Sequence, residues 1–335
     1  MEYRVLGNTG LRISRLGFGG IPIQKTTKEA VRELMHALAD AGVNYIDTAR
    51  AYTVSEEFIG YGIQGIRDRF VLATKSMSRS ADGMAQDIRT SLQKLGTDYI
   101  DLYQIHNPSA AELERICGPE GALEALLEAK AQGIIGHIGI TLHSVDLFRQ
   151  ALELDWVETI MFPYNIVETQ GEDLIARCQE KNIGFICMKP LAGGAIEDAN
   201  LALRFIAANE GVDVVIPGMC DEKELRQNLA AVCAGTPLSP CELAQMQTIR
   251  QELGTHFCRR CNYCAPCTVG IPISAVFLMD GYLSRYGLED WARKRYNGLA
   301  KPASACVGCG LCESRCPYQL PIRQMLKSAA QKFGK

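Results

Sequence analysis

Two tight runs of cysteines lie near the end of this sequence. The first run consists of Cys258, Cys261, Cys264 and Cys267. The second run, followed directly by a proline, consists of Cys306, Cys309, Cys312 and Cys316. The C-x2-C-x2-C-x3-C-P spacing of the second run is typical of segments that ligate a 4Fe–4S cluster, and the first run is one residue shorter before its last cysteine. Eight thiolates so spaced predict two 4Fe–4S clusters and a protein that handles single electrons.

Zinc is the alternative metal for these cysteines. A structural zinc site takes two separated Cys-x-x-Cys pairs to complete one tetrahedron. Here each run supplies three or four thiolates on one loop, and it does so twice, which favours clusters. The fourth cysteine of each run can ligate either its own cluster or that of the other run, and the spacing leaves both arrangements open.

A second group of chemically active residues follows short apolar stretches in the first half of the chain. Asp47, Lys75 and His106 each end such a stretch, and Tyr52 comes five residues after Asp47. If the stretches are parallel strands of a barrel, their carboxyl ends meet at one mouth. We expect Lys75 beside Tyr52 to lower the pKa of the tyrosine, which would make it a proton donor near neutral pH. Asp47 would hold Lys75 charged, and His106 would orient a carbonyl oxygen.

The elements that must position these residues alternate regularly. After a hairpin over 2–16, we expect eight strands, at 17–20, 43–46, 70–74, 99–105, 134–140, 157–162, 183–188 and 212–216. We expect helices between and after them, at 27–41, 55–65, 82–94, 119–132, 144–153, 171–181, 199–210 and 221–235. Ser55, Ser144 and Asp221 are the expected helix caps. The alternation predicts an α/β fold, a closed (β/α)8 barrel, over an open doubly wound sheet, because no Gly-x-Gly-x-x-Gly follows the first strand.

The regular pattern ends near residue 235, where a stretch with two prolines precedes a new helix at Cys241. We therefore predict a barrel domain over 1–235 and a second domain over 236–335. Each cysteine run is followed by an apolar-Pro-Ile step into a helix, and helical segments are expected around 274–298. The second domain is predicted to be mainly helical and to hold both clusters.

Several motifs give the first 235 residues a family resemblance. These motifs are Asp47-Thr48-Ala49-x-x-Tyr52, Lys75 at a strand end, Asp101 to Pro108, Gly136 to Thr141, Pro163-Tyr164-Asn165, Ile216-Pro217-Gly218, and Asn228. They resemble the aldo-keto reductases, and the tail resembles the ferredoxin-type extension of one iron–sulfur branch of that family. The resemblance implies that Tyr52 is the general acid, that Lys75 and Asp47 tune it, and that His106 orients the substrate. It also implies that a nicotinamide lies across the barrel mouth.

The resemblance extends to the cofactor site, with departures. It gives Thr141 and Asn165 as carboxamide partners, and Pro217, Gly218, Glu224 and Asn228 as further cofactor contacts. Met188 and Met161 stand where the family usually has a stacking tyrosine and a carboxamide glutamine. Glu224 stands where NADP-dependent members carry a basic residue, so NAD(H) is favoured over NADP(H). Lys189 and His143 are either anion-binding groups at the mouth or solvated loop charges.

The charge of the chain is unevenly distributed. Residues 256–335 hold 12 Lys and Arg against 4 Asp and Glu, whereas the remainder holds 23 against 34. The basic tail either docks on the acidic barrel or attracts a ferredoxin or other acidic electron carrier. No recognition motif points to nucleic acid. No signal peptide or apolar run long enough to span a bilayer is seen, so a cytoplasmic location is expected.

Three functions remain open from the sequence. The leading one is an oxidoreductase that interconverts a carbonyl and an alcohol and exchanges electrons through the clusters. A nicotinamide moves two electrons and a cluster moves one, and a flavin would normally connect them, yet no flavin motif is recognisable. In the second, the barrel no longer uses a nicotinamide and cluster electrons reduce the substrate. In the third, the clusters are structural or redox-sensing and the protein is not a catalyst.

Overall fold

The structure is a computed structural model that describes residues 1–334. It divides into two compact units. The first comprises Met1–Asn165, Thr169–Pro190 and Asp198–Pro237. The second comprises Ile166–Glu168, Leu191–Glu197 and the chain from Leu238 onward. Two short segments within the first 235 residues thus belong to the second unit, and the domain boundary near residue 235 stays a prediction.

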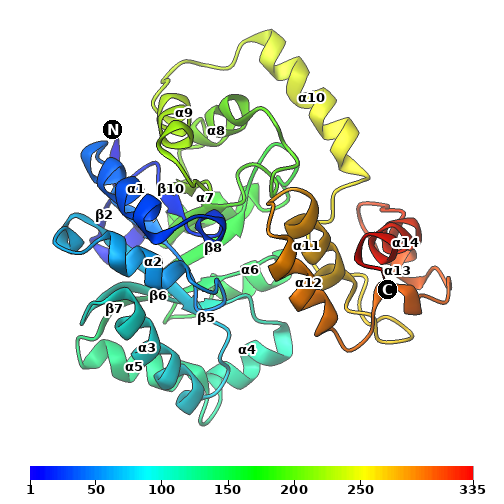
Figure 1. Ribbon diagram of the computed structural model, residues 1–335, viewed down its shortest axis with the longest axis horizontal. Coiled ribbons are helices and arrows are strands. Elements are labelled where there is room, and N and C mark those ends of the chain that lie inside the picture. Colours follow the sequence, from blue (N-terminus) through cyan, green and yellow to red (C-terminus); the bar gives the residue numbers. More distant parts are fainter. Residues whose placement is uncertain (335) are drawn as a thin grey trace. The chain divides into compact units, whose positions relative to one another are not determined.

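The first unit is a barrel of eight parallel strands (Figure 1). In order they are β3 (Phe18–Gly19), β4 (Tyr45–Asp47), β5 (Val71–Ser76), β6 (Ile100–His106), β7 (Ile135–Thr141), β8 (Thr159–Pro163), β9 (Gly184–Met188) and β10 (Val214–Ile216). Each pairs with the next, and hydrogen bonds from Gly17 N to Val215 O (2.8 Å) and from Gly19 N to Pro217 O (2.9 Å) link the first strand to the last. The predicted (β/α)8 barrel and all eight strands are confirmed.

Helices follow the strands and cover the barrel. They are α1 (Lys28–Asp40), α2 (Ser55–Gly62), α3 (Ala81–Leu95), α4 (Ala110–Cys117), α5 (Ala122–Ala131), α6 (Val145–Ala151), α7 (Glu172–Glu180), α8 (Ala199–Ala207) and α9 (Glu222–Val232). Their apolar faces pack on the outward side chains of the strands in one continuous core. A smaller core fills the barrel interior, where Leu102, Met161 and Ile186 are buried. Strands buried on both faces explain the nearly continuous apolar stretches in the sequence.

The hairpin of β1 (Tyr3–Val5) and β2 (Arg12–Ser14) places Leu6 and Ile13 in this interior core. Gly7 allows the hairpin to lie directly against Gly184 at the start of β9. Its φ is +52°, and a Cβ atom there would lie 2.2 Å from Gly184 N. Only glycine tolerates both conditions.

Two expectations about helices were wrong in detail. The single helix expected at 119–132 begins at Ala122, and α4 precedes it as a separate helix with a Ser109–Glu112 capping box. Ser55 does not cap α2, because its hydroxyl instead donates to Gly20 O at 2.9 Å. Ser144 and Asp221 cap α6 and α9 as expected.

The tail of the second unit is helical. It contains α10 (Pro240–Gly254), α11 (Ile273–Ser284), α12 (Glu289–Asn297), α13 (Leu311–Ser314) and α14 (Ile322–Phe333). The segment expected around 274–298 is two helices, since the chain turns at Gly287 with φ of +65°. Within this tail, Tyr296 stacks on Phe333, with ring centroids 3.9 Å apart. The prediction of a mainly helical tail is confirmed.

Candidate active site and cluster sites

The residues expected at the barrel mouth come from neighbouring strands. Asp47 is the last residue of β4, His106 is the last of β6, and Lys75 lies one residue before the end of β5. Tyr52 lies in the loop between β4 and α2. Because parallel strands end on one side of the barrel, all four side chains reach the same end.

Distances confirm that the structure brings these four side chains together. Lys75 Nζ donates to Asp47 Oδ2 at 2.5 Å and to Thr48 O at 2.8 Å. The same Nζ lies 5.1 Å from the ring centroid of Tyr52. The rings of Tyr52 and His106 meet edge to face, with centroids 6.1 Å apart. The tyrosine thus lies between a lysine and a histidine.

The Asp47–Lys75 pair is almost completely withdrawn from water, since Lys75 is 2% exposed. Burial raises the pKa of Asp47 and lowers the pKa of Lys75, and in each case the charge of the partner opposes the shift. Such a lysine releases a proton more readily than one in water. A group of this kind beside a phenol can assist proton transfer to a bound oxygen.

Gln104 is a member of this site that the sequence analysis missed. Its Nε2 donates to Asp47 Oδ1 at 3.3 Å, and the residue is fully buried. A signal was available, because Gln104 is a polar residue two positions before His106 in the same strand. Residues two apart in a strand share a face.

Glu56 was also missed, and it anchors a second buried network beside the site. Its carboxylate accepts from Thr74 Oγ1 at 2.8 Å and from Ser91 Oγ at 2.7 Å, and it pairs with Arg50. This network holds β5 against α2 and α3.

The backbone is strained at three places on the same end of the barrel. Thr53, directly after Tyr52, has φ of +40°; Asn107, directly after His106, has +46°; and Lys189, directly after β9, has +55°. Such conformations cost energy in residues other than glycine, most of all in a β-branched threonine, and they concentrate at functional sites.

The predicted cofactor contacts form two groups. Thr141 ends β7, and its Oγ1 accepts from Asn107 N at 3.0 Å. Asn165 follows β8, and its Nδ2 donates to Lys189 O at 2.9 Å. His143 is half-buried two residues after Thr141. These side chains lie where the strands end, but their roles toward a cofactor stay predictions.

The second group lies where β10 leads into α9. Gly218 is bridged to Gly19, and a Cβ atom on Gly218 would lie 2.5 Å from Pro22 Cγ, next to the buried Pro217. Glu224 accepts from Cys220 N at 2.7 Å, and Asn228 is buried on α9. Glu224 therefore closes the turn that starts the helix, and its carboxylate is half-buried.

The two methionines noted in the sequence lie inside the barrel. Met188 ends β9, and Met161 is paired in register with Thr141 at the end of β7. Both are buried among apolar side chains.

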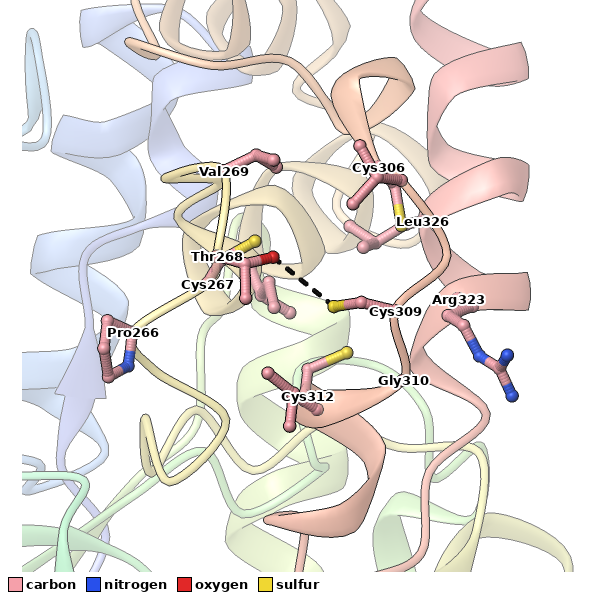
Figure 2. Close-up of a pocket in the computed structure, with 13 residues that line it drawn as sticks. Pro266, Cys267, Thr268, Val269, Cys306, Cys309, Gly310, Cys312, Arg323 and Leu326 are labelled. Carbon is pink, nitrogen blue, oxygen red and sulfur yellow. Dashed lines mark hydrogen bonds between the residues drawn. The ribbon is translucent and has the colours of Figure 1, made fainter.

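The eight cysteines of the two runs line two cavities in the second unit. The first cavity is lined by Cys258, Cys261, Cys264 and Cys316. The second cavity is lined by Cys267, Cys306, Cys309 and Cys312. Figure 2 shows the four sulfurs of the second cavity converging, with the Thr268 hydroxyl 3.4 Å from the sulfur of Cys309. The fourth cysteine of each run therefore joins three cysteines of the other run.

The loops that carry three cysteines each have matching conformations. Arg260 and Asn262 have φ of +60° and +65°, and Gly308 and Gly310, at the same positions of the second loop, have +73° and +78°. In both loops a cysteine sulfur accepts a hydrogen bond from the backbone N–H of the residue two positions after that cysteine. Arg260 N donates to Cys258 in the first loop, and Leu311 N donates to Cys309 in the second. Such bonds favour thiolates.

The donor sets fit iron–sulfur clusters. Burial, with the neighbouring thiols adding to it, raises the pKa of Cys264 to about 12, so four thiolates need a cationic partner. In the described chain, no three of the eight cysteine sulfurs all lie within 4.8 Å of one another. A single zinc would bring its sulfurs to about 3.8 Å from one another. The wider spacing suits a cluster.

Comparisons with known proteins agree with this geometry. Residues 15–201 match the model of the aldo/keto reductase family, and residues 254–320 match that of a 4Fe-4S dicluster domain. A barrel with this mouth, joined to such a tail, defines an oxidoreductase that carries iron–sulfur clusters. The chain belongs to the aldo/keto reductase family.

Individual relatives are moderately similar. The chain is 27% identical over 284 residues to L-galactose dehydrogenase of Arabidopsis thaliana, covering 69% of this chain and 88% of that protein. It is 33% identical over 230 residues to aldo-keto reductase YhdN of Bacillus subtilis, covering 59% and 66%. Among solved structures, the holo form of aldo-keto reductase AKR11C1 from Bacillus halodurans gives a TM-score of 0.65 at 26% identity, covering 74% of this chain and 96% of that one.

Within residues 1–334, none of the helices has both the length and the apolar character that crossing a bilayer requires.

Proposed function

We propose that this protein is an oxidoreductase that interconverts a carbonyl and an alcohol at the barrel mouth and couples this reaction to single-electron transfer through two 4Fe–4S clusters. The observation that carries the proposal is the buried Asp47–Lys75 pair beside Tyr52, in one chain with two four-cysteine cavities. Reduction of the carbonyl consumes two electrons and two protons.

Tyr52 is proposed as the donor of the proton that the carbonyl oxygen receives. Lys75 lies close enough to its ring to stabilise the phenolate that remains, and Asp47 fixes Lys75 through a 2.5 Å bond. His106, edge-on to Tyr52, would hold the same oxygen in line with the phenol. Deep burial of the pair keeps water from competing for the proton.

The residues at the strand ends fit a nicotinamide, which would supply a hydride when bound. Thr141 and Asn165 would bind its carboxamide, and Lys189 would bind an anionic group. Glu224, half-buried at the start of α9, would repel a 2′-phosphate and accept from a free ribose hydroxyl. We therefore favour NAD(H) over NADP(H). His143, Pro217, Gly218 and Asn228 would complete the cofactor contacts.

The two cavities would hold the clusters, and the second cavity has the most exposed ligand. Cys309 is exposed, and the neighbouring Val307 and Leu311 are exposed apolar side chains. Together with the basic tail, they support docking of a ferredoxin or another acidic electron carrier at the second cavity. Each docking event would pass one electron, so two events would balance one carbonyl reduction or one alcohol oxidation.

Two measurements test the proposal. Replacement of Tyr52 by Phe should lower carbonyl turnover by at least about 100-fold while the iron content is unchanged. Anaerobic addition of NADH to the wild-type protein should bleach the cluster absorbance. Full turnover by Y52F would remove Tyr52 from the mechanism.

A second candidate function is favoured by the buried Met161 and Met188 near the mouth. These thioethers cannot supply the amide contact and the aromatic stacking surface expected for a nicotinamide. In this alternative the clusters deliver two electrons in succession to the substrate, with protons from Tyr52 and from water. Bleaching by dithionite but not by NADH, followed by substrate-dependent reoxidation, would favour it.

A flavin would be indicated if one were released on denaturation. Clusters that no donor reduces would favour a structural or sensing role.

A further inference from the structure

The two matching cysteine loops differ at one position in the charge and the burial of the side chain. Arg259 follows Cys258, and Val307 follows Cys306 at the equivalent place. Arg259 lines the first cavity and is 7% exposed, whereas Val307 is 65% exposed. One loop thus buries a cation beside its cavity where the other presents an apolar side chain to water.

The contacts of Arg259 do not neutralise its charge. Its guanidinium donates to three backbone carbonyl oxygens, those of Gly254 (3.1 Å), Phe257 (3.4 Å) and Val167 (3.2 Å). It also lies 3.9 Å from the ring centroid of Tyr318. Within residues 1–334, its Nε has no hydrogen-bond partner and no carboxylate forms an ion pair with it.

The neighbouring arginine is matched by an acid. Arg260 pairs with the fully buried Glu168 at 3.3 Å, within the same unit. The pair leaves Arg259 as the unbalanced positive charge at the first cavity. An unpaired buried charge is costly, so a folded protein needs a counter-ion there. A 4Fe–4S cluster with four thiolates provides one, with a net charge of about −2 when oxidised and about −3 when reduced.

The second cavity has no such buried cation in the described chain. Arg323 is exposed, pairs with Glu313 at 2.7 Å, and extends away from the four sulfurs (Figure 2). Arg315 is also exposed and donates to Pro266 O at 2.9 Å. Water and salt screen exposed charges far more than a buried one.

We propose that Arg259 is the built-in counter-ion of the cluster in the first cavity and selectively favours the one-electron reduced state of that cluster. The inference rests on the cluster part of the proposed function and is independent of the barrel chemistry. Since the reduced cluster carries one more negative charge, a buried cation stabilises it more than the oxidised cluster and raises its reduction potential.

The test is a redox titration of the full-length protein followed by electron paramagnetic resonance. The variant C261S should lose the cluster of the first cavity. The signal that disappears in C261S therefore identifies that cluster. R259Q removes the charge and keeps an amide that can donate two hydrogen bonds. At a fixed potential, it should lower the reduced-to-oxidised ratio of that cluster at least about tenfold, a shift of about 59 mV for one electron, and leave the other cluster unchanged.

Two variants are matched controls. R259K keeps the charge and should stay closer to wild type than to R259Q. V307Q, the neutral change at the equivalent position, should move neither potential. An unshifted first-cavity potential in fully loaded R259Q would overturn the inference, and so would an equal shift of both clusters or an R259K value equal to that of R259Q. An iron content near zero in the wild-type protein would instead refute the clusters themselves.

Discussion

Lys75 Nζ lies 2.5 Å from Asp47 Oδ2 at the mouth of the barrel, in a pair that water hardly reaches. Removing one member of such a pair leaves the other as a buried, uncompensated charge. We expect D47N to unfold about 3 kcal/mol more easily than the wild type. The double variant D47N/K75M should recover part of that loss. Denaturant unfolding of the three proteins checks this, and a double variant less stable than D47N would contradict it.

The same substitution should affect chemistry through Lys75. Without Asp47, the lysine loses the charge that opposes its desolvation, so its pKa should fall further below the usual value. We expect D47N to lower kcat/KM by about 100-fold or more, and the acidic limb of its pH–rate profile to move to lower pH. An unaltered profile would show that Lys75 does not contribute to proton transfer.

Each cavity is lined by cysteines from both runs. This arrangement predicts which cysteine variants lose the same cluster. C316S should remove the same cluster signal as C264S, although Cys316 belongs to the other run, because both line the first cavity. C267S should resemble C309S in the same way. Each variant should lose roughly half of the iron, because one quartet of two is broken. Mössbauer or electron paramagnetic resonance spectra would instead group C316S with C309S if each run held its own cluster.

We expect Glu224 to determine whether the protein prefers NADH or NADPH. Replacement by Lys removes a negative charge and adds a positive one at the start of α9. We expect E224K to increase the affinity for NADPH relative to NADH by at least about tenfold. Fluorescence titration with both nucleotides checks the ratio, and Q227K, on the same helix, is the control for a general effect of added charge. A wild-type protein that already prefers NADPH would contradict the role given to Glu224.

Asp213 accepts a hydrogen bond from Phe185 N at 2.8 Å. We expect this carboxyl group to make the folding stability of the protein depend on pH. Burial raises its pKa to about 6, above the usual 3.8 of an aspartate. Since the folded-state pKa is raised, the penalty for the carboxylate is absent below pH 3.8, grows as pH rises, and is complete above pH 6. D213N, which keeps an acceptor, should be more stable than wild type by at most about 3 kcal/mol at pH 8 and by about half of that at pH 5. Thermal unfolding at the two pH values tests this, and an advantage that does not grow with pH would count against it.

Much of the barrel could be predicted because its strands are buried on both faces and end in ionisable residues. Asp47, Lys75 and His106 stand out in the sequence for that reason. Gln104 escaped notice because its partner, Asp47, is 57 residues away in sequence and only the register of β4, β5 and β6 brings them together.

The environment of the clusters could be predicted less well. Spacing identified eight ligands, but the same spacing allows each run to close on itself or to exchange its last cysteine. Arg259 and Arg260 look alike in the sequence. They differ because Glu168, from a segment 92 residues earlier, pairs with Arg260. Information of this kind lies in the tertiary fold rather than in a local pattern.

The exchange of Cys267 and Cys316 between the two loops also has a consequence for maturation. Whichever cluster is inserted first ties the two cysteine runs to each other, so the loop that receives the second cluster has already lost most of its conformational freedom. The second insertion is therefore entropically easier than the first. A population supplied with too little iron and sulfide should divide into empty and doubly filled chains, and single-cluster chains should be rare.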